Sequence, residues 1–186
     1  MLDLGAHAGQ SAASVHLVQP GWRVLCFEPD PAVRWSLLAT AVAMRGRMRF
    51  RLQGVAEHAG TRTLHVPMAG HRRIEGEASF DLETLTTDPI TVARLEGLGM
   101  TGCVTLERPV VRIDELRLEP VAVKLDLQGG ELSALRGALH TLRRHTPPVL
   151  MENNRNSGVI AELLAPLRYR PRGPFEALNV LFTVDG

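Results

Sequence analysis

The first apolar run of the sequence, residues 1–4, contains a carboxylate, Asp3, and is followed by small residues. The segment Asp3-Leu4-Gly5-Ala6-His7-Ala8-Gly9 leads from that run into a predicted helix over 10–19. Glycines in such a loop let the backbone pass close to a ligand and point amide groups at it. Glu28 ends the next apolar run, and a carboxylate about 20 residues after such a loop accepts hydrogen bonds from ribose hydroxyls. The two features together predict a nucleoside cofactor.

The loop sequence also bears on which nucleoside is bound. A dinucleotide site has the pattern G-x-G-x-x-G, whereas this chain has G-x-x-x-G at Gly5 and Gly9. Asp3 would repel a pyrophosphate but suits a cofactor with an amino group and a positive sulfonium. The pattern therefore favours S-adenosylmethionine over NAD. His7 lies in the same loop, where it either contacts the cofactor or substrate or caps the turn.

A second group of ionisable residues is expected beside the cofactor. Lys124 and Asp126 are two apart on a predicted strand and so share a face, Glu131 begins the next helix, and Glu152 ends the next strand. Asp126 is the first candidate for a general base, followed by Glu131 and Glu152. Lys124 is the only lysine among 21 basic residues, which suggests a need for a compact ammonium. The alternative is that Lys124 only neutralises Asp126 or Glu152 in a structural ion pair.

Strands and helices alternate at both ends of the chain, which indicates a parallel α/β sheet with seven core strands. The predicted strands are 1–4, 23–27, 48–53, 121–126, 148–152, 168–171 and 177–184, the last two forming a hairpin around 172–174. The predicted helices are 10–19, 31–44, 131–145 and 159–167. Residues 54–113 interrupt the alternation, with exposed strands over 61–67 and 105–113, a loop over 69–87 and a short helix over 89–98. We therefore expect a single domain over residues 1–186 with an insert at about 54–113.

Composition narrows the class of protein. The 186 residues are 45% apolar with a net charge of +1, which gives no general attraction to nucleic acid or membranes. No run reaches the roughly 20 apolar residues of a membrane helix, and no signal peptide opens the chain. Cys26 lies in an apolar run, which favours a buried reduced thiol over a disulfide. Together these features predict a cytoplasmic protein. His58, His65 and His71 lack the spacing of metal ligands, so no metal site is predicted.

Arginines alternate with other residues at Arg45, Arg47, Arg49 and Arg51. One interpretation is a basic face for nucleic acid or phosphate. A charged edge strand that resists aggregation is favoured, because no aromatic residues interleave to stack on bases.

Six successive blocks of the chain closely resemble FkbM-type methyltransferases. They are DLGAHAGQ, FEPDP, GVAEHAGTRTL, RIDEL, VAVKLDLQGGELSALRGA and PPVLMEN. The resemblance implies methyl transfer from S-adenosylmethionine, usually to a hydroxyl of a sugar or a polyketide-type natural product. It also implies a Rossmann-like class I fold, with helices on both faces of a mostly parallel sheet of order 3-2-1-4-5-7-6. It makes Asp3, Gly5, Gly9 and Glu28 cofactor contacts, and it makes Lys124, Asp126 and Glu131 the central polar motif.

The chain departs from the family at its start. Family members usually have residues before the first strand, whereas Met1 lies almost at that strand, so a truncated N-terminus is expected. Two alternatives to the methyltransferase stay open. One is an NAD-dependent oxidoreductase, and the other, suggested by this start, is a truncated cofactor-binding domain without turnover. The sequence indicates neither the acceptor nor the oligomeric state.

Overall fold

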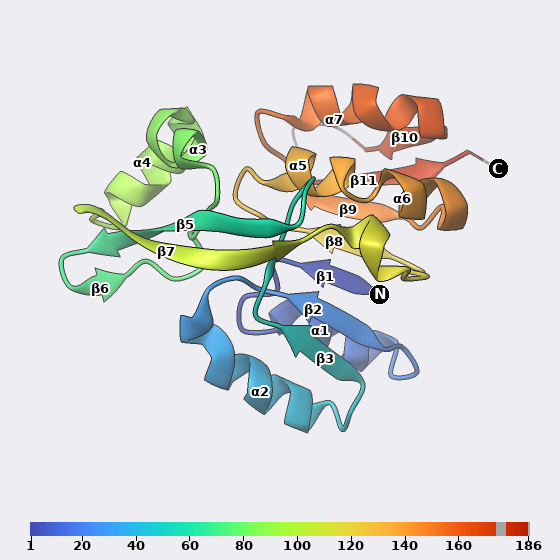
Figure 1. Cartoon of the computed structure of the whole chain (residues 1–186), viewed down its shortest axis with the longest axis horizontal. Helices are drawn as coiled ribbons and strands as arrows, with labels where there is room; N and C mark the ends of the chain where they lie inside the picture. Colours follow the sequence, from blue (N-terminus) through green and yellow to red (C-terminus); the bar gives the residue numbers. More distant parts are fainter. Residues whose placement is uncertain (174–177, 186) are drawn as a thin grey trace.

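The computed structural model describes residues 1–173 and 178–185. Its main sheet has seven strands in the order β10-β11-β9-β8-β1-β2-β3 (Figure 1). The strands are β1 (Leu2–Leu4), β2 (Val24–Phe27), β3 (Met48–Arg51), β8 (Val123–Leu125), β9 (Val149–Glu152), β10 (Tyr169–Arg172) and β11 (Asn179–Val184). β3, β2, β1, β8 and β9 pair in parallel, whereas β11 is antiparallel to both neighbours. Numbered within this sheet alone, the order from the β3 edge is 3-2-1-4-5-7-6.

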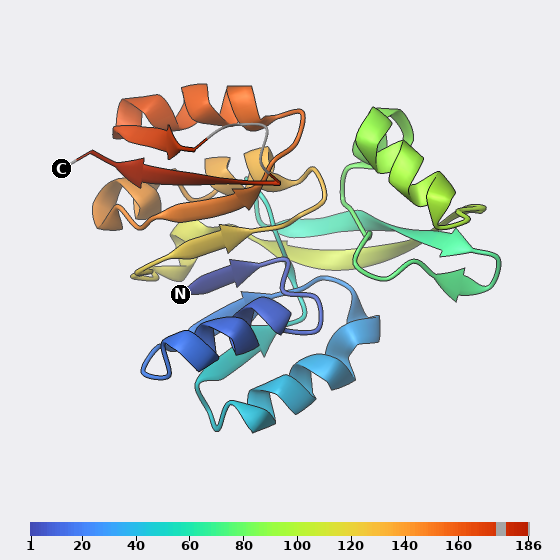
Figure 2. The same cartoon turned by 180° about the vertical axis from the view of Figure 1, so that it is seen from behind.

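Helices cover both faces of this sheet, because its short strands carry apolar side chains on both sides (Figures 1 and 2). Val24 and Cys26 of β2 pack with α1 (Gln10–Val18) and α2 (Arg34–Ala43), and α2 follows a 3₁₀ turn, η1 (Pro31–Val33). Leu2 and Leu4 of β1 belong to the larger core on the opposite face. The elements of that core are α5 (Glu131–Arg136), α6 (Leu139–His145), α7 (Ser157–Leu164) and the 3₁₀ turn η3 (Ala165–Leu167). The mixed α/β architecture expected from the sequence is therefore present.

Residues 54–113 form a second sheet of order β4-β7-β5-β6 and two helices, at the left of Figure 1. The elements are β4 (Gly54–Val55), β5 (Gly60–Ala69), β6 (Arg72–Arg73), α3 (Leu82–Thr87), α4 (Pro89–Gly97) and β7 (Gly102–Val111), followed by η2 (Ile113–Leu116). The prediction of a loop over 69–87 is wrong, because this segment contains β6 and α3. The Asp81 carboxylate begins α3 by accepting hydrogen bonds from the amides of Glu83 at 3.1 Å and Thr84 at 3.4 Å.

Other boundaries also differ from those predicted. The helix expected over 131–145 is two helices, because the Asp114 carboxylate caps α6 through the amides of His140 and Thr141. Gly137, at the break, lies so close to Ala56 that an added Cβ would be 2.3 Å from the Ala56 carbonyl oxygen. In the predicted terminal hairpin, residues 174 and 177 lie outside the described residues.

β3 is an edge strand of the main sheet, as expected for the alternating arginines. Only Arg49 and Arg51 lie within it, because Arg45 and Arg47 belong to the preceding turn. Over residues 1–173 and 178–185, no helix is long and apolar enough to cross a membrane.

Candidate functional site

The two glycines of the first loop have different structural roles. Both have a positive φ, 81° at Gly5 and 88° at Gly9, where side chains other than glycine are strained. A Cβ at Gly5 would lie 1.8 Å from the carbonyl oxygen of Asp126, so glycine is needed where the ends of β1 and β8 approach. Gly9 precedes α1 and packs against Thr40 and Met48. Gly9 therefore positions the helix.

The backbone amides of this loop point toward β2. The amides of Gly5 and Ala6 donate to the Phe27 carbonyl at 2.9 and 3.1 Å. The amide of His7 donates to Oε2 of Glu28 at 2.8 Å. The prediction that this loop points amides at a ligand is therefore wrong for these three residues, because the amides stabilise the crossing from β1 to β2.

Glu28 is buried at the carboxyl end of β2. Its Oε1 accepts from the amide of Asp30 at 2.9 Å, and its Oε2 accepts from the amide of His7. Burial raises the pKa of this carboxyl, although the two backbone hydrogen bonds oppose that effect. A carboxylate oxygen has two acceptor sites, so each oxygen keeps one for a ligand hydroxyl.

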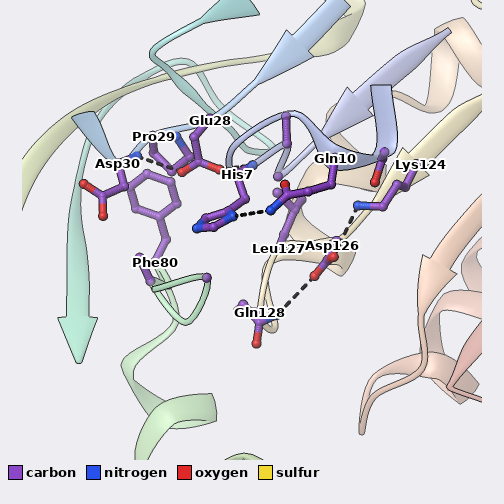
Figure 3. A pocket seen from close by; sticks show the side chains of 15 residues that line it. His7, Gln10, Glu28, Pro29, Asp30, Phe80, Lys124, Asp126, Leu127 and Gln128 are labelled. Carbon is purple, nitrogen blue, oxygen red and sulfur yellow. Dashed lines mark hydrogen bonds and ion pairs between the residues drawn. The ribbon is translucent and has the colours of Figure 1, made fainter. Parts of the chain in front are cut away.

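A cavity of about 410 Å³ opens beside this loop, at the carboxyl ends of β1, β2 and β8 (Figure 3). Five of the predicted site residues line it, namely Gly5, His7, Glu28, Lys124 and Asp126. Asp3, Gly9 and Glu131 do not line it. Further lining residues, none of them predicted as site residues, are Gln10, Asp30, Phe80 and Gln128.

The insert supplies Phe80 to the cavity and holds Asp30, which follows β2, in place. The half-buried ring of Phe80 packs against Gly54, where an added Cβ would lie 2.3 Å from the ring. Asp30 pairs with Arg73 of β6 at 2.6 Å. Phe80 lies within the loop predicted over 69–87, where a turn was expected rather than a site residue.

Lys124 lies between two carboxylates. Its Nζ is 3.2 Å from Oδ2 of Asp126 and 3.6 Å from Oδ1 of Asp3. Asp3 is fully buried beneath Lys124, and burial raises its pKa to about 6 although the ammonium lowers it. The structure therefore places Asp3 behind the cavity wall, where it holds Lys124, and it joins Lys124 to Asp126 as predicted.

Glu131 is also fully buried, and both of its oxygens have partners. Oε1 accepts from the amide of Leu127 at 2.6 Å, and Oε2 accepts from the side-chain amide of Asn154 at 2.8 Å. Burial raises the pKa of the Glu131 carboxyl. Its placement is that of a positioning residue, which ties the loop after β8 to the loop after β9.

Gln128 connects the main sheet to the insert. Its Nε2 donates to Oδ1 of Asp126 at 3.1 Å and to Oε2 of Glu152 at 3.2 Å, and its Oε1 accepts from Arg94 of α4 at 2.7 Å. Gln128 adopts a φ of 50°, which is rare for a non-glycine residue. The bonds to three partners hold this side chain in one orientation. Glu152 is thereby brought beside Asp126, as predicted.

The sheet and the cavity at the carboxyl ends of its strands define an α/β protein of methyltransferase-like fold. The family model of the Methyltransferase FkbM domain matches residues 3–170, and the chain belongs to this family. The chain resembles the crystal structure of methyltransferase FkbM from Methylobacillus flagellatus KT with a TM-score of 0.62 and 19% identity. The match covers 98% of this chain and 42% of that chain, so this chain spans less than half the length of that protein. A search of curated proteins found no match.

Proposed function

We propose that the chain binds S-adenosylmethionine in the cavity beside Glu28 and transfers its methyl group to a hydroxyl oxygen of a small acceptor, such as a sugar or a natural product. Membership of the FkbM methyltransferase family supports methyl transfer. The observation that carries the choice of cofactor is the chemistry of the cavity. Glu28, Asp30 and Asp126 line it, whereas the amides of Gly5, Ala6 and His7 already have partners.

This chemistry favours a cationic nucleoside over a dinucleotide. A pyrophosphate is normally bound by free amides of the glycine-rich loop and the following helix N-terminus; here the amides of Gly5, Ala6 and His7 have partners, and carboxylates line the cavity beside them. The remaining acceptor sites of Glu28 suit the two hydroxyls of a ribose. Asp126 lines the other side of the cavity and Asp3 lies behind that wall, and Lys124 partly balances the negative charge of the two carboxylates. A sulfonium cofactor supplies the reactive methyl group, and the protein aligns it and excludes water.

We propose further that the protein is a cytoplasmic enzyme that acts on a small molecule and has no nucleic-acid or membrane partner. Cys26 and Cys103 are free thiols in the structure. No group of three or more metal-binding side chains occurs in the described part of the chain. The NAD-dependent alternative is not favoured, because the chain belongs to a methyltransferase family.

Calorimetry with S-adenosylhomocysteine and with NAD tests the cofactor. We expect the adenosyl ligand to bind and NAD not to bind. Glu28→Ala should weaken binding by about 1–3 kcal/mol, because the ribose loses its hydrogen bonds to the carboxylate. Glu162→Ala, on the exposed side of α7, is the control and should leave affinity unchanged. Binding of NAD without binding of the adenosyl ligand would refute the assignment.

A further inference from the structure

A second cavity, of about 420 Å³, adjoins the cofactor cavity at Gln128. It lies between α4 and the loop after β9, and its walls include Pro89, Ile90, Arg94 and Glu152. Its volume is within the range of about 300–1,000 Å³ that is usual for small-molecule sites. We propose that this cavity binds a neutral hydroxylated acceptor and that Glu152 takes the proton of its reacting hydroxyl, which rests on the proposed methyl transfer.

The hydrogen bonds of the three candidate carboxylates single out Glu152. Both oxygens of Glu131 have short partners, and Glu131 lines neither cavity. Asp126 is engaged through Oδ2 by Lys124 and through Oδ1 by Gln128. Glu152 shares only Oε2 with Gln128, and the nearest cation to Oε1 in the described structure is Arg94, at 3.7 Å. Oε1 of Glu152 therefore keeps its acceptor capacity for a substrate proton.

The charges around Glu152 also fit a proton acceptor. Burial raises its pKa to about 7, and the neighbouring carboxylates Asp126, Glu131 and Glu77 act in the same direction while Arg94 opposes them. A general base is most effective when its pKa lies near the working pH. In the transfer step, the acceptor O–H proton moves to Glu152 and the oxygen electron pair forms the O–CH₃ bond. The electron pair of the broken S–CH₃ bond stays on the sulfur, which becomes a neutral thioether.

The charge balance of the cavity argues for a neutral acceptor. Arg94 is paired with Glu77 at 2.8 Å, and Arg155 is paired with Asp81 at 3.2 Å. A phosphate or carboxylate ligand would have to displace one of these pairs and would face Glu152 across the cavity. Pro89 and Ile90 supply apolar wall instead. A sugar-like molecule with hydroxyls and an apolar face meets these conditions.

The test follows the Glu152 carboxyl by ¹³C NMR in the full chain labelled with [5-¹³C]glutamate, without cofactor. The Glu152 resonance is the one lost in Glu152→Gln, and Glu162→Gln is the exposed control. We expect a titration midpoint of about 7, and a higher midpoint in Arg94→Gln because a cation is removed. Saturating methyl glucoside should move this resonance, and glucose 6-phosphate should not.

Turnover gives a second readout, measured as S-adenosylhomocysteine release over a panel of methyl glycosides. Glu152→Gln should lower kcat by about 10²–10⁴-fold and leave S-adenosylhomocysteine affinity unchanged. A Glu152 that titrates with the exposed carboxylates, ignores the glucoside, or responds more to the phosphate ester would overturn the inference. Failure to bind S-adenosylhomocysteine would instead count against the proposed cofactor, because the NMR results are obtained without it.

Discussion

Gly5 provides the sharpest test of how the site is assembled, because the structure gives a matched control. Gly5 and Gly46 have nearly the same φ, 81° and 80°. At Gly5 an added Cβ would lie 1.8 Å from the Asp126 carbonyl oxygen, whereas at Gly46 it would meet nothing within 4 Å. Alanine at either position carries the same left-handed strain, of about 1–2 kcal/mol. The difference between the two variants therefore measures the close approach of β1 and β8.

The extra cost at Gly5 follows from the backbone that must move. The ends of β1 and β8 would separate, which threatens the 2.9 Å hydrogen bond from the Asp126 amide to the Leu4 carbonyl. Loss of a buried hydrogen bond costs about 1–3 kcal/mol, and overpacking costs a similar amount. We therefore expect Gly5→Ala to reduce the free energy of unfolding by roughly 2–6 kcal/mol more than Gly46→Ala does.

Urea unfolding followed by circular dichroism measures both variants against the parent chain. In thermal unfolding, each kcal/mol should lower Tm by about 2–4 °C in a domain of this size. Gly46→Ala should fold and bind S-adenosylhomocysteine like the parent, because it lies outside the cavity. Equal losses of stability in the two variants would refute the reasoning that Gly5 is required by the Asp126 carbonyl.

Three further outcomes follow from buried charges. The pKa of Asp3 is raised to about 6, so its stabilising contribution is present at low pH and is lost as the pH rises through 6. Asp3→Asn should therefore stabilise the chain more at pH 8 than at pH 4. Equal effects in urea unfolding at the two pH values would contradict this. Glu131→Gln should lower the free energy of unfolding by about 1–3 kcal/mol, because the new side-chain amide faces two donors. A double-mutant cycle with Asn154→Ala should show coupling, and additive losses would argue against the Glu131–Asn154 hydrogen bond. Lys124→Arg should lower both the free energy of unfolding and the affinity for S-adenosylhomocysteine, because a planar guanidinium does not fit between Asp3 and Asp126. A variant equal to the parent in both assays would show that charge alone suffices.

The parallel core was predictable because its strands are continuous apolar runs buried on both faces. Leu2, Leu4, Val24 and Cys26 are all buried, although they belong to cores on opposite faces of the sheet. Residues 69–87 were not predictable in the same way. A two-residue strand and a six-residue helix are too short to show a period, and α3 depends on the Asp81 cap.

The loop between β1 and α1 shows that residue types can indicate a site without revealing its geometry. The spacing of Gly5, His7 and Glu28 predicted that these residues lie close together, and they line one cavity. The direction of the loop amides was not predictable, because it depends on the Phe27 carbonyl of a neighbouring strand. Asp3 was placed at the cofactor for its charge, yet it pairs with Lys124 on the neighbouring strand, and the lysine side chain lies between Asp3 and the cavity.

The proposed acceptor cavity depends on tertiary contacts that no local sequence pattern contains. Glu77 and Arg94 come from the insert, Gln128 from the loop after β8, and Glu152 from the end of β9. Each is an ordinary charged or polar residue in its own segment, and only the folded insert brings them within hydrogen-bond distance. Since Arg94 holds Gln128, and Gln128 holds both Asp126 and Glu152, the orientation of the two carboxylates depends on the position of α4. The insert is therefore a structural part of the proposed reaction site, and changes in α4 should alter Glu152 before they alter the cavity residues around Glu28.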